Sequence, residues 1–193
     1  MADPRCEHCD GPMPLLARRH ARFCSTRCRV AAHRAKPTIP AALRERERWV
    51  RRSAAKVPLT ASGMVASSTD SATWCDYDTA RRSTAGAGMG FVLDGDGIAC
   101  IDLDGCLDEY GAPAEWVVPI LAACPVTWVE VSPSGRGLHI WGTADLLGGR
   151  RKPYRGHKVE VYGSGRYIAV TGTTFRNAPT RLSDLSAVLA EVL

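Results

Sequence analysis

Four cysteines near the start of the chain constrain its fold more tightly than any other sequence feature. Cys6 and Cys9 are spaced C-x2-C, Cys24 and Cys28 are spaced C-x3-C, and fourteen residues separate the two pairs. Thiolates paired in this way can meet one tetrahedral zinc ion, and so short a segment has no hydrophobic core to fold around otherwise. The alternative is four free thiols on a basic tail. We expect residues 1–36 to form a structural zinc-binding module.

Charge is distributed unevenly along the chain. Residues 1–56 contain 14 Lys/Arg and 5 Asp/Glu, a balance of +9, whereas residues 57–193 contain 11 and 15, a balance of −4. A basic N-terminal part on a mildly acidic body suggests contact with a polyanion, most often nucleic acid.

No apolar run reaches the length that spans a bilayer, and the basic, cysteine-containing residues 1–30 are unlike a signal peptide. We therefore expect a cytoplasmic protein without a membrane partner, in which disulfides do not form.

The remaining residues, 41–193, favour an α+β domain. Helical patterns are predicted at 69–80, 112–124 and 182–193, the first capped by Thr69 and the last by Ser183. Strand-like runs are predicted at 88–93, 97–104, 126–132, 137–142, 157–163 and 166–172. The Asp-Gly turn at 94–97 is typical of a hairpin between its flanking strands, and residues 158–172 are predicted to form a second hairpin.

Two aspartates in the run "GIACIDLD" are the first candidates for chemistry. Asp102 and Asp104 alternate with Ile101 and Leu103, so on a strand both carboxylates project from one face. Neighbouring carboxylates repel unless a cation lies between them, and oxygen ligands suit magnesium or manganese. The alternative is a half-buried strand with a polar solvent face.

Two further motifs accompany these aspartates. "SPSGRGLHIW" is a Ser/Gly-rich loop that exposes hydroxyls and backbone N–H groups to an anion, adds the charge of Arg136, and runs into a strand with His139. In "KVEVYG", Glu160 alternates with Val159 and Val161 and is a candidate third ligand; otherwise it is an ordinary exposed strand glutamate.

In this order the motifs resemble the primase-polymerase catalytic module of the archaeo-eukaryotic primase superfamily, in its compact phage and plasmid form. The resemblance covers residues 45–175. It implies an RRM-like core with a small α/β unit enclosing a cleft, so residues 41–193 would be the catalytic domain behind the zinc module.

The resemblance also implies roles. Asp102, Asp104 and Glu160 would hold two magnesium or manganese ions, although many relatives have aspartate at the third position. His139 would contact the nucleotide phosphates. The other residues implied in nucleotide binding are Ser134, Arg136, Gly137, Arg166 and Lys56.

The implied activity is template-dependent nucleotidyl transfer, as a DNA primase or polymerase acting on single-stranded DNA with NTPs or dNTPs. A 3′-hydroxyl would attack the α-phosphate in a two-metal mechanism. The zinc module would grip the template backbone in a salt-sensitive, mostly sequence-neutral contact. Its arginines are Arg18, Arg19, Arg22, Arg27, Arg29 and Arg34.

Two other functions use the same residues. A metal-dependent nuclease would activate water with the carboxylates, although it needs no triphosphate cradle. A non-catalytic replication module would only hold nucleotide or single-stranded DNA. Because the sequence has no G-x4-G-K-[ST] loop, a replicative helicase would be a separate partner.

Overall fold

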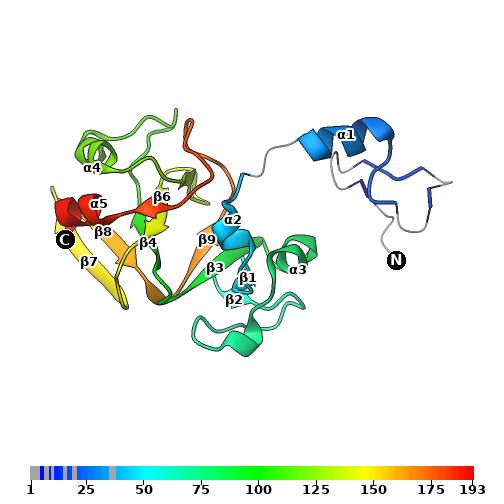
Figure 1. The fold of residues 1–193 in the computed structure, drawn as a ribbon, viewed down its shortest axis with the longest axis horizontal. Coiled ribbons are helices and arrows are strands. Elements are labelled where there is room, and N and C mark those ends of the chain that lie inside the picture. The colour runs from blue at the N-terminus through cyan, green and yellow to red at the C-terminus, as the bar shows by residue number, and fades with distance from the viewer. Residues whose placement is uncertain (1–4, 7–8, 10, 15–16, 19–20, 35–37) are drawn as a thin grey trace. The chain divides into compact units, whose positions relative to one another are not determined.

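The structure is a computed structural model that describes residues 5–6, 9, 11–14, 17–18, 21–34 and 38–193. The chain forms two compact units, Met1–Pro37 and Thr38–Leu193 (Figure 1). In the first unit a basic helix, α1 (Thr26–Arg34), begins between the two cysteines of the second pair and contains Cys28, and Arg5 forms an isolated β-bridge with Pro12.

The second unit is built on two mainly antiparallel sheets, which confirms the α+β class. A four-stranded sheet has the order β2 (Pro58–Leu59), β1 (Trp49–Arg52), β3 (Gly88–Asp94), β9 (Ser164–Val170). A six-stranded sheet has the order β10 (Ser183–Asp184), β6 (Leu138–Thr143), β4 (Ile98–Leu103), β8 (His157–Tyr162), β7 (Gly149–Tyr154), with β5 (Val129–Val131) also paired to β6. The β10–β6 pair is parallel.

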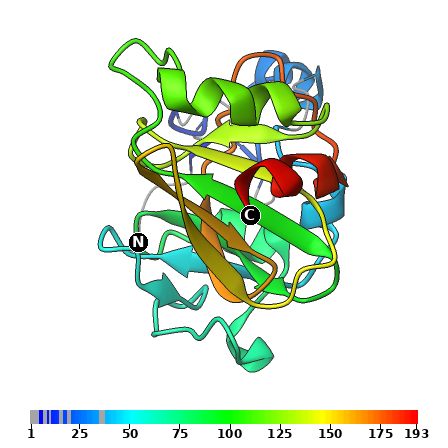
Figure 2. The same ribbon diagram turned by 90° about the vertical axis from the view of Figure 1, so that its left-hand side faces the viewer.

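Helices cover one face of the six-stranded sheet (Figure 2). The 3-10 turn η2 (Glu115–Val117) leads into α4 (Val118–Ala123), and α5 (Ser186–Val192) ends the chain. Ile120 of α4 and Val188 of α5 share a hydrophobic cluster with Ile101 and Leu103 of β4. The apolar face of α5, with Val188, Leu189 and Val192, is therefore the face that packs on the sheet.

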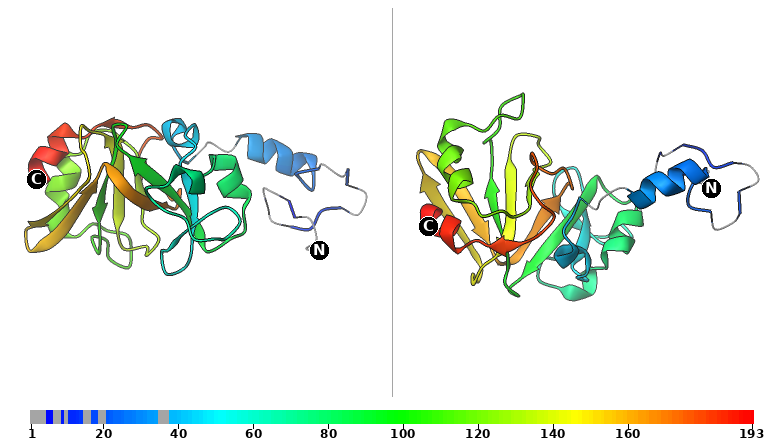
Figure 3. Two further views of the ribbon diagram at one scale, coloured as in Figure 1. Left: turned by 90° about the horizontal axis from the view of Figure 1, so that it is seen from below. Right: turned by 45° about the horizontal axis from the view of Figure 1, so that its top comes forward.

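The other face of the six-stranded sheet packs against the four-stranded sheet (Figure 3). Phe91 of β3 and Trp141 of β6 meet edge to face, with ring centroids 6.0 Å apart. Both faces of β4 are therefore buried, and its burial pattern is interrupted only at Asp102. A polar side chain inside such a strand needs a partner or a ligand.

Both predicted hairpins are wrong. The strands β3 and β4, which flank the turn at 94–97, belong to different sheets, and so do β8 and β9. Leu93 and Cys100 lie in one cluster between the sheets, so the strands stack face to face instead of pairing edge to edge. The same Asp-Gly turn residues can connect two strands of one hairpin or two strands of stacked sheets, so the turn sequence does not distinguish the two arrangements.

Helix boundaries also differ from the predicted ones. Residues 69–80 contain a 3-10 turn, η1 (Ser71–Thr73), and then α3 (Tyr77–Arg82), which is capped by the Asp76 carboxylate. The short α2 (Ala41–Arg44) precedes β1. Ser183 lies in β10 and does not cap α5. Within the described ranges, no helix is both long and apolar enough to cross a membrane.

Candidate functional site

Five charged or titratable side chains form a row across neighbouring strands of the six-stranded sheet. Asp102 on β4 is directly opposite His139 on β6 and Glu160 on β8. Glu130 on β5 is opposite His139, and Arg151 on β7 is opposite Glu160. Directly opposed residues project from the same face, so the register itself brings these groups together. We call Glu130, His139, Asp102, Glu160 and Arg151 the cross-strand row.

Asp102 is the buried carboxylate at the centre of this row. Its side chain is 20% exposed, and its Oδ1 atom has no hydrogen-bond partner among the described residues. Nε2 of His139 is 3.6 Å away, beyond hydrogen-bond length. Burial raises the pKa of Asp102 above its usual value, against the lowering effect of His139, and Asp104 and Glu160 raise it further. A buried carboxylate oxygen without a hydrogen-bond partner is suited to bind a cation.

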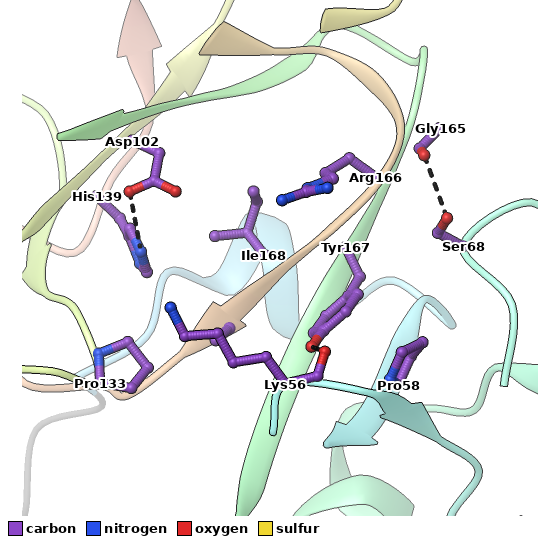
Figure 4. Close-up of a pocket in the computed structure, with 11 residues that line it drawn as sticks. Lys56, Pro58, Ser68, Asp102, Pro133, His139, Gly165, Arg166, Tyr167 and Ile168 are labelled. Atoms are coloured by element: carbon purple, nitrogen blue, oxygen red, sulfur yellow. Dashed lines mark hydrogen bonds and ion pairs between the residues drawn. The ribbon is translucent and has the colours of Figure 1, made fainter. Parts of the chain in front are cut away.

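A cavity of about 360 Å³ lies over this carboxylate, between strands of the two sheets (Figure 4). Of the sequence-predicted residues it brings together Asp102, His139, Lys56 and Arg166. The other lining residues are Pro58, Ser68, Pro133, Gly165, Tyr167, Ile168 and Ala169. The cavity is thus lined by one carboxylate, that of Asp102, and by two basic side chains, those of Lys56 and Arg166.

Lys56 reaches the cavity from the loop between β1 and β2. Its φ of 60° is in the left-handed region, which is uncommon for a residue with a side chain. The Tyr167 hydroxyl donates to the Lys56 carbonyl, and the Lys56 N–H donates to Ser53 at 3.1 Å. These contacts hold the turn, and the ammonium group points into the cavity (Figure 4).

Arg166 enters the cavity from β9. Its guanidinium carbon lies 4.9 Å from the centre of the Tyr162 ring. Figure 4 shows the guanidinium directed toward the side of the cavity that holds Asp102. The planar guanidinium group, with its several N–H donors, is suited to bind an anionic group in the cavity.

Glu160 does not line the cavity. Its side chain is 14% exposed, and its carboxylate lies 3.1 Å from Nε of Arg151 and 3.8 Å from Nζ of Lys158. The Tyr162 hydroxyl also donates to it. This carboxylate is therefore already neutralised by basic groups of the β7–β8 hairpin.

Asp104 lies one residue beyond the end of β4, in an exposed turn before Gly105. The sequence placed both aspartates on the strand, but the strand pairing ends at Leu103. Among the described residues, the acidic groups do not place three ligand atoms within 4.8 Å of one another. Asp102 offers an oxygen without a hydrogen-bond partner among the described residues, but a three-carboxylate site requires Asp102, Asp104 and Glu160 to converge further.

The Ser/Gly-rich loop connects β5 to β6 outside the cavity, except for Pro133. Some of its N–H groups are engaged within the loop: Ser132 donates to the Gly137 carbonyl at 2.9 Å, and Arg136 donates to the Ser134 hydroxyl at 3.3 Å. A side chain at Gly137 would lie 2.8 Å from the Leu103 carbonyl, so this glycine permits close packing on β4. The exposed Ser134 and Arg136 side chains remain able to meet an anion.

Sequence reasoning missed Glu130. It is fully buried on β5, and its Oε1 atom lies 3.1 Å from Nδ1 of His139. A glutamate between two valines of a strand, on the face shared with a candidate histidine, is the signal that could have identified it. Tyr167 and Ser68 were also missed; the Ser68 hydroxyl donates to the Gly165 carbonyl at 3.1 Å.

The four N-terminal cysteines converge, with sulfur atoms all within 4.8 Å of one another. Sγ of Cys24 is 3.5 Å from Cys28 and 3.7 Å from Cys9. The neighbouring thiols raise the pKa of Cys24 to about 12, because a thiolate among thiols lacks a countercharge. Four convergent sulfurs are the donor set of a structural zinc site. Arg19 and the Arg34 side chain lie outside the described residues.

Comparison with known proteins gives one strong similarity. No family model matches the sequence. A curated protein named DNA primase-polymerase, from Nitratiruptor phage NrS-1, is 38% identical over 141 residues. The match covers 66% of this chain, and the chain spans 19% of the length of that relative.

Proposed function

We propose that this chain carries the catalytic module of a phage-type DNA primase-polymerase, with residues 1–36 as a zinc module and residues 41–193 as the catalytic domain. The observation that carries the proposal is the cavity in which Asp102 and His139 meet Lys56 and Arg166. The similarity to the phage enzyme supports the same activity class. Template-dependent incorporation of labelled nucleotides tests it, and absence of product with magnesium and with manganese would contradict it.

The charges of the cavity suit a triphosphate held beside a cation. A divalent ion at Asp102, with Asp104 and Glu160 as further ligands, would supply Lewis-acid activation of a primer 3′-hydroxyl and of the α-phosphate. Lys56 and Arg166 would bind the phosphate oxygens, and His139, with a hydrogen on both ring nitrogens, would donate to them from Nε2. Ser134 and Arg136, with the loop that Gly137 packs against β4, would contact the outer phosphates. For Glu160 to serve as a ligand, its contact with Arg151 has to open.

The strand order supports the expected RRM-like core only in part. The run β4–α4–β5–β6 forms a strand–helix–strand–strand unit in which β4 pairs with β6, as in the first part of a split βαβ arrangement. Between β6 and β8 the chain forms β7 in place of a second helix, and α5 covers the same face from the C-terminal end.

Arg166→Gln should weaken nucleotide binding about tenfold or more, because a hydrogen bond to a charged group contributes about 1.5–3 kcal/mol. Titration calorimetry with a dNTP and magnesium measures this change. Arg150→Gln is the matched control, since Arg150 is an exposed β7 residue outside the cavity lining. Equal affinities for both variants would remove Arg166 from the nucleotide site.

Deletion of residues 1–36 should weaken binding of single-stranded DNA while dNTP affinity stays unchanged. The deleted segment carries a positive balance that contacts phosphates without reading sequence. Fluorescence anisotropy at matched salt concentrations measures the loss and a shallower salt dependence. Equal DNA affinity with and without the segment would reject this role.

A non-catalytic nucleotide-binding or DNA-binding module is the second candidate. It is favoured because Asp102, Asp104 and Glu160 do not all lie within 4.8 Å of one another and because Glu160 contacts Arg151. Binding of dNTP and DNA without turnover, under both metals, would support it. Shortened DNA would instead support a nuclease.

A further inference from the structure

Glu130 is surrounded by hydrogen-bond donors. Its Oε2 atom accepts hydrogen bonds from the backbone N–H groups of Thr171 and Gly172, each at 2.9 Å. Its Oε1 atom accepts from the indole Nε1–H of Trp141 at 3.2 Å. All three N–H groups can only donate, and the Thr171 hydroxyl also lies 3.0 Å from Oε2. Both oxygens of this buried carboxylate therefore act as hydrogen-bond acceptors.

This environment determines which ring nitrogen of the neighbouring His139 carries the hydrogen. Nδ1 of His139 lies 3.1 Å from the same Oε1 atom. Since Oε1 acts as an acceptor, as its contact with the Trp141 indole N–H shows, Nδ1 has to carry the hydrogen. The other ring nitrogen, Nε2, then faces Asp102 at 3.6 Å and the cavity that His139 lines. The His139 side chain is 5% exposed, so the ring has little room to take another orientation.

We propose that Glu130 is a positioning residue that holds the His139 ring with Nδ1–H toward itself and Nε2 toward the substrate cavity. The relevance of Nε2 to a nucleotide rests on the proposed function, whereas the orientation and tautomer of the ring do not. A carboxylate behind a functional histidine fixes which nitrogen is offered to the ligand. If Glu130 only connected the end of β9 to β5, its replacement would not change the tautomer of His139.

Glu130→Gln separates these two roles because it keeps the shape of the side chain. The glutamine oxygen has to face the two backbone N–H groups of Thr171 and Gly172. Its NH2 group then faces Nδ1 of His139, which must become an acceptor, so the ring hydrogen moves to Nε2. The hydrogen bond from the Trp141 indole N–H is lost in the same variant. We expect this reversal of the tautomer, and a loss of about tenfold to a hundredfold in incorporation kcat/KM.

Long-range ¹⁵N–¹H correlation spectra of the histidine rings, recorded on the full chain where the ring is neutral, read the tautomer directly. The signal that disappears in His139→Asn assigns the residue. The wild type should show Nδ1–H, and Glu130→Gln should show Nε2–H. Glu109→Gln, at an exposed glutamate in the 108–111 turn, should leave both the spectrum and the activity unchanged.

An Nε2–H tautomer in the wild type overturns the proposal without any variant, so the test does not depend on the folding of Glu130→Gln. A folded Glu130→Gln with the wild-type tautomer overturns it as well. If the expected tautomers appear but the wild type incorporates no nucleotide, the proposed function fails and the positioning role of Glu130 stands.

Discussion

We expect Asp102→Asn to lower the rate of nucleotide incorporation by about a thousandfold, which is the largest effect on activity that we predict. The substitution removes the negative charge from the buried oxygen that has no hydrogen-bond partner among the described residues. Cation stabilisation of the developing charge is worth several kcal/mol, and each 1.4 kcal/mol is tenfold in rate. Primer-extension rates measure it. Asp145→Asn, at an exposed aspartate outside the cavity, is the matched control.

The same substitution should not destabilise the metal-free protein. The pKa of Asp102 is raised in the folded state, so folding binds a proton between the ordinary pKa and the raised one. Stability therefore falls as pH rises through that window, and at neutral pH the ionised carboxylate opposes folding. In chelator, Asp102→Asn should melt at the wild-type temperature or above it. A lower melting temperature together with lost activity would mean that the variant acts through the fold.

Removing zinc is expected to have the largest effect on structure, confined to the first unit. In small zinc modules, metal binding supplies about 10–16 kcal/mol of apparent free energy, which is folding free energy. We expect one zinc per chain by elemental analysis, and loss of it in Cys24→Ser. After chelation, trypsin should cleave rapidly within residues 1–37, where arginines are frequent, and leave residues 38–193 intact.

Cys124→Ser is the control for this experiment, since Cys124 lies outside the cysteine quartet and in the second unit. It should retain zinc and trypsin resistance. Freshly prepared wild-type protein without zinc, or equal resistance of Cys24→Ser and the wild type, would contradict the structural role of the metal.

The strands that carry the site could be predicted from sequence because their signals are local. Alternation around Glu160 placed Val159 and Val161 in the core, where the structure has them. The spacing of the N-terminal cysteines likewise predicted their convergence. In each case the whole pattern lies within one short segment of the chain.

Neighbours brought together by pairing between distant strands could not be predicted in this way. Nothing in the spacing shows that Asp102 lies opposite both His139 and Glu160, since that register depends on strands far apart in the chain. The same limit explains the wrong hairpin at 94–97. An Asp-Gly turn closes a hairpin or connects two stacked sheets equally well, and burial of both faces of β4 decides between them.

The measurement that tests the central claim most directly is a gel assay of the full chain with single-stranded DNA and labelled nucleotides. Magnesium or manganese is supplied, with and without a primer, beside the Asp102→Asn/Asp104→Asn double variant. We predict products that lengthen with the wild type and vanish with the double variant, and the unprimed lane distinguishes primase from polymerase. Equal products from both proteins, or no product from the wild type with either metal, would contradict the account.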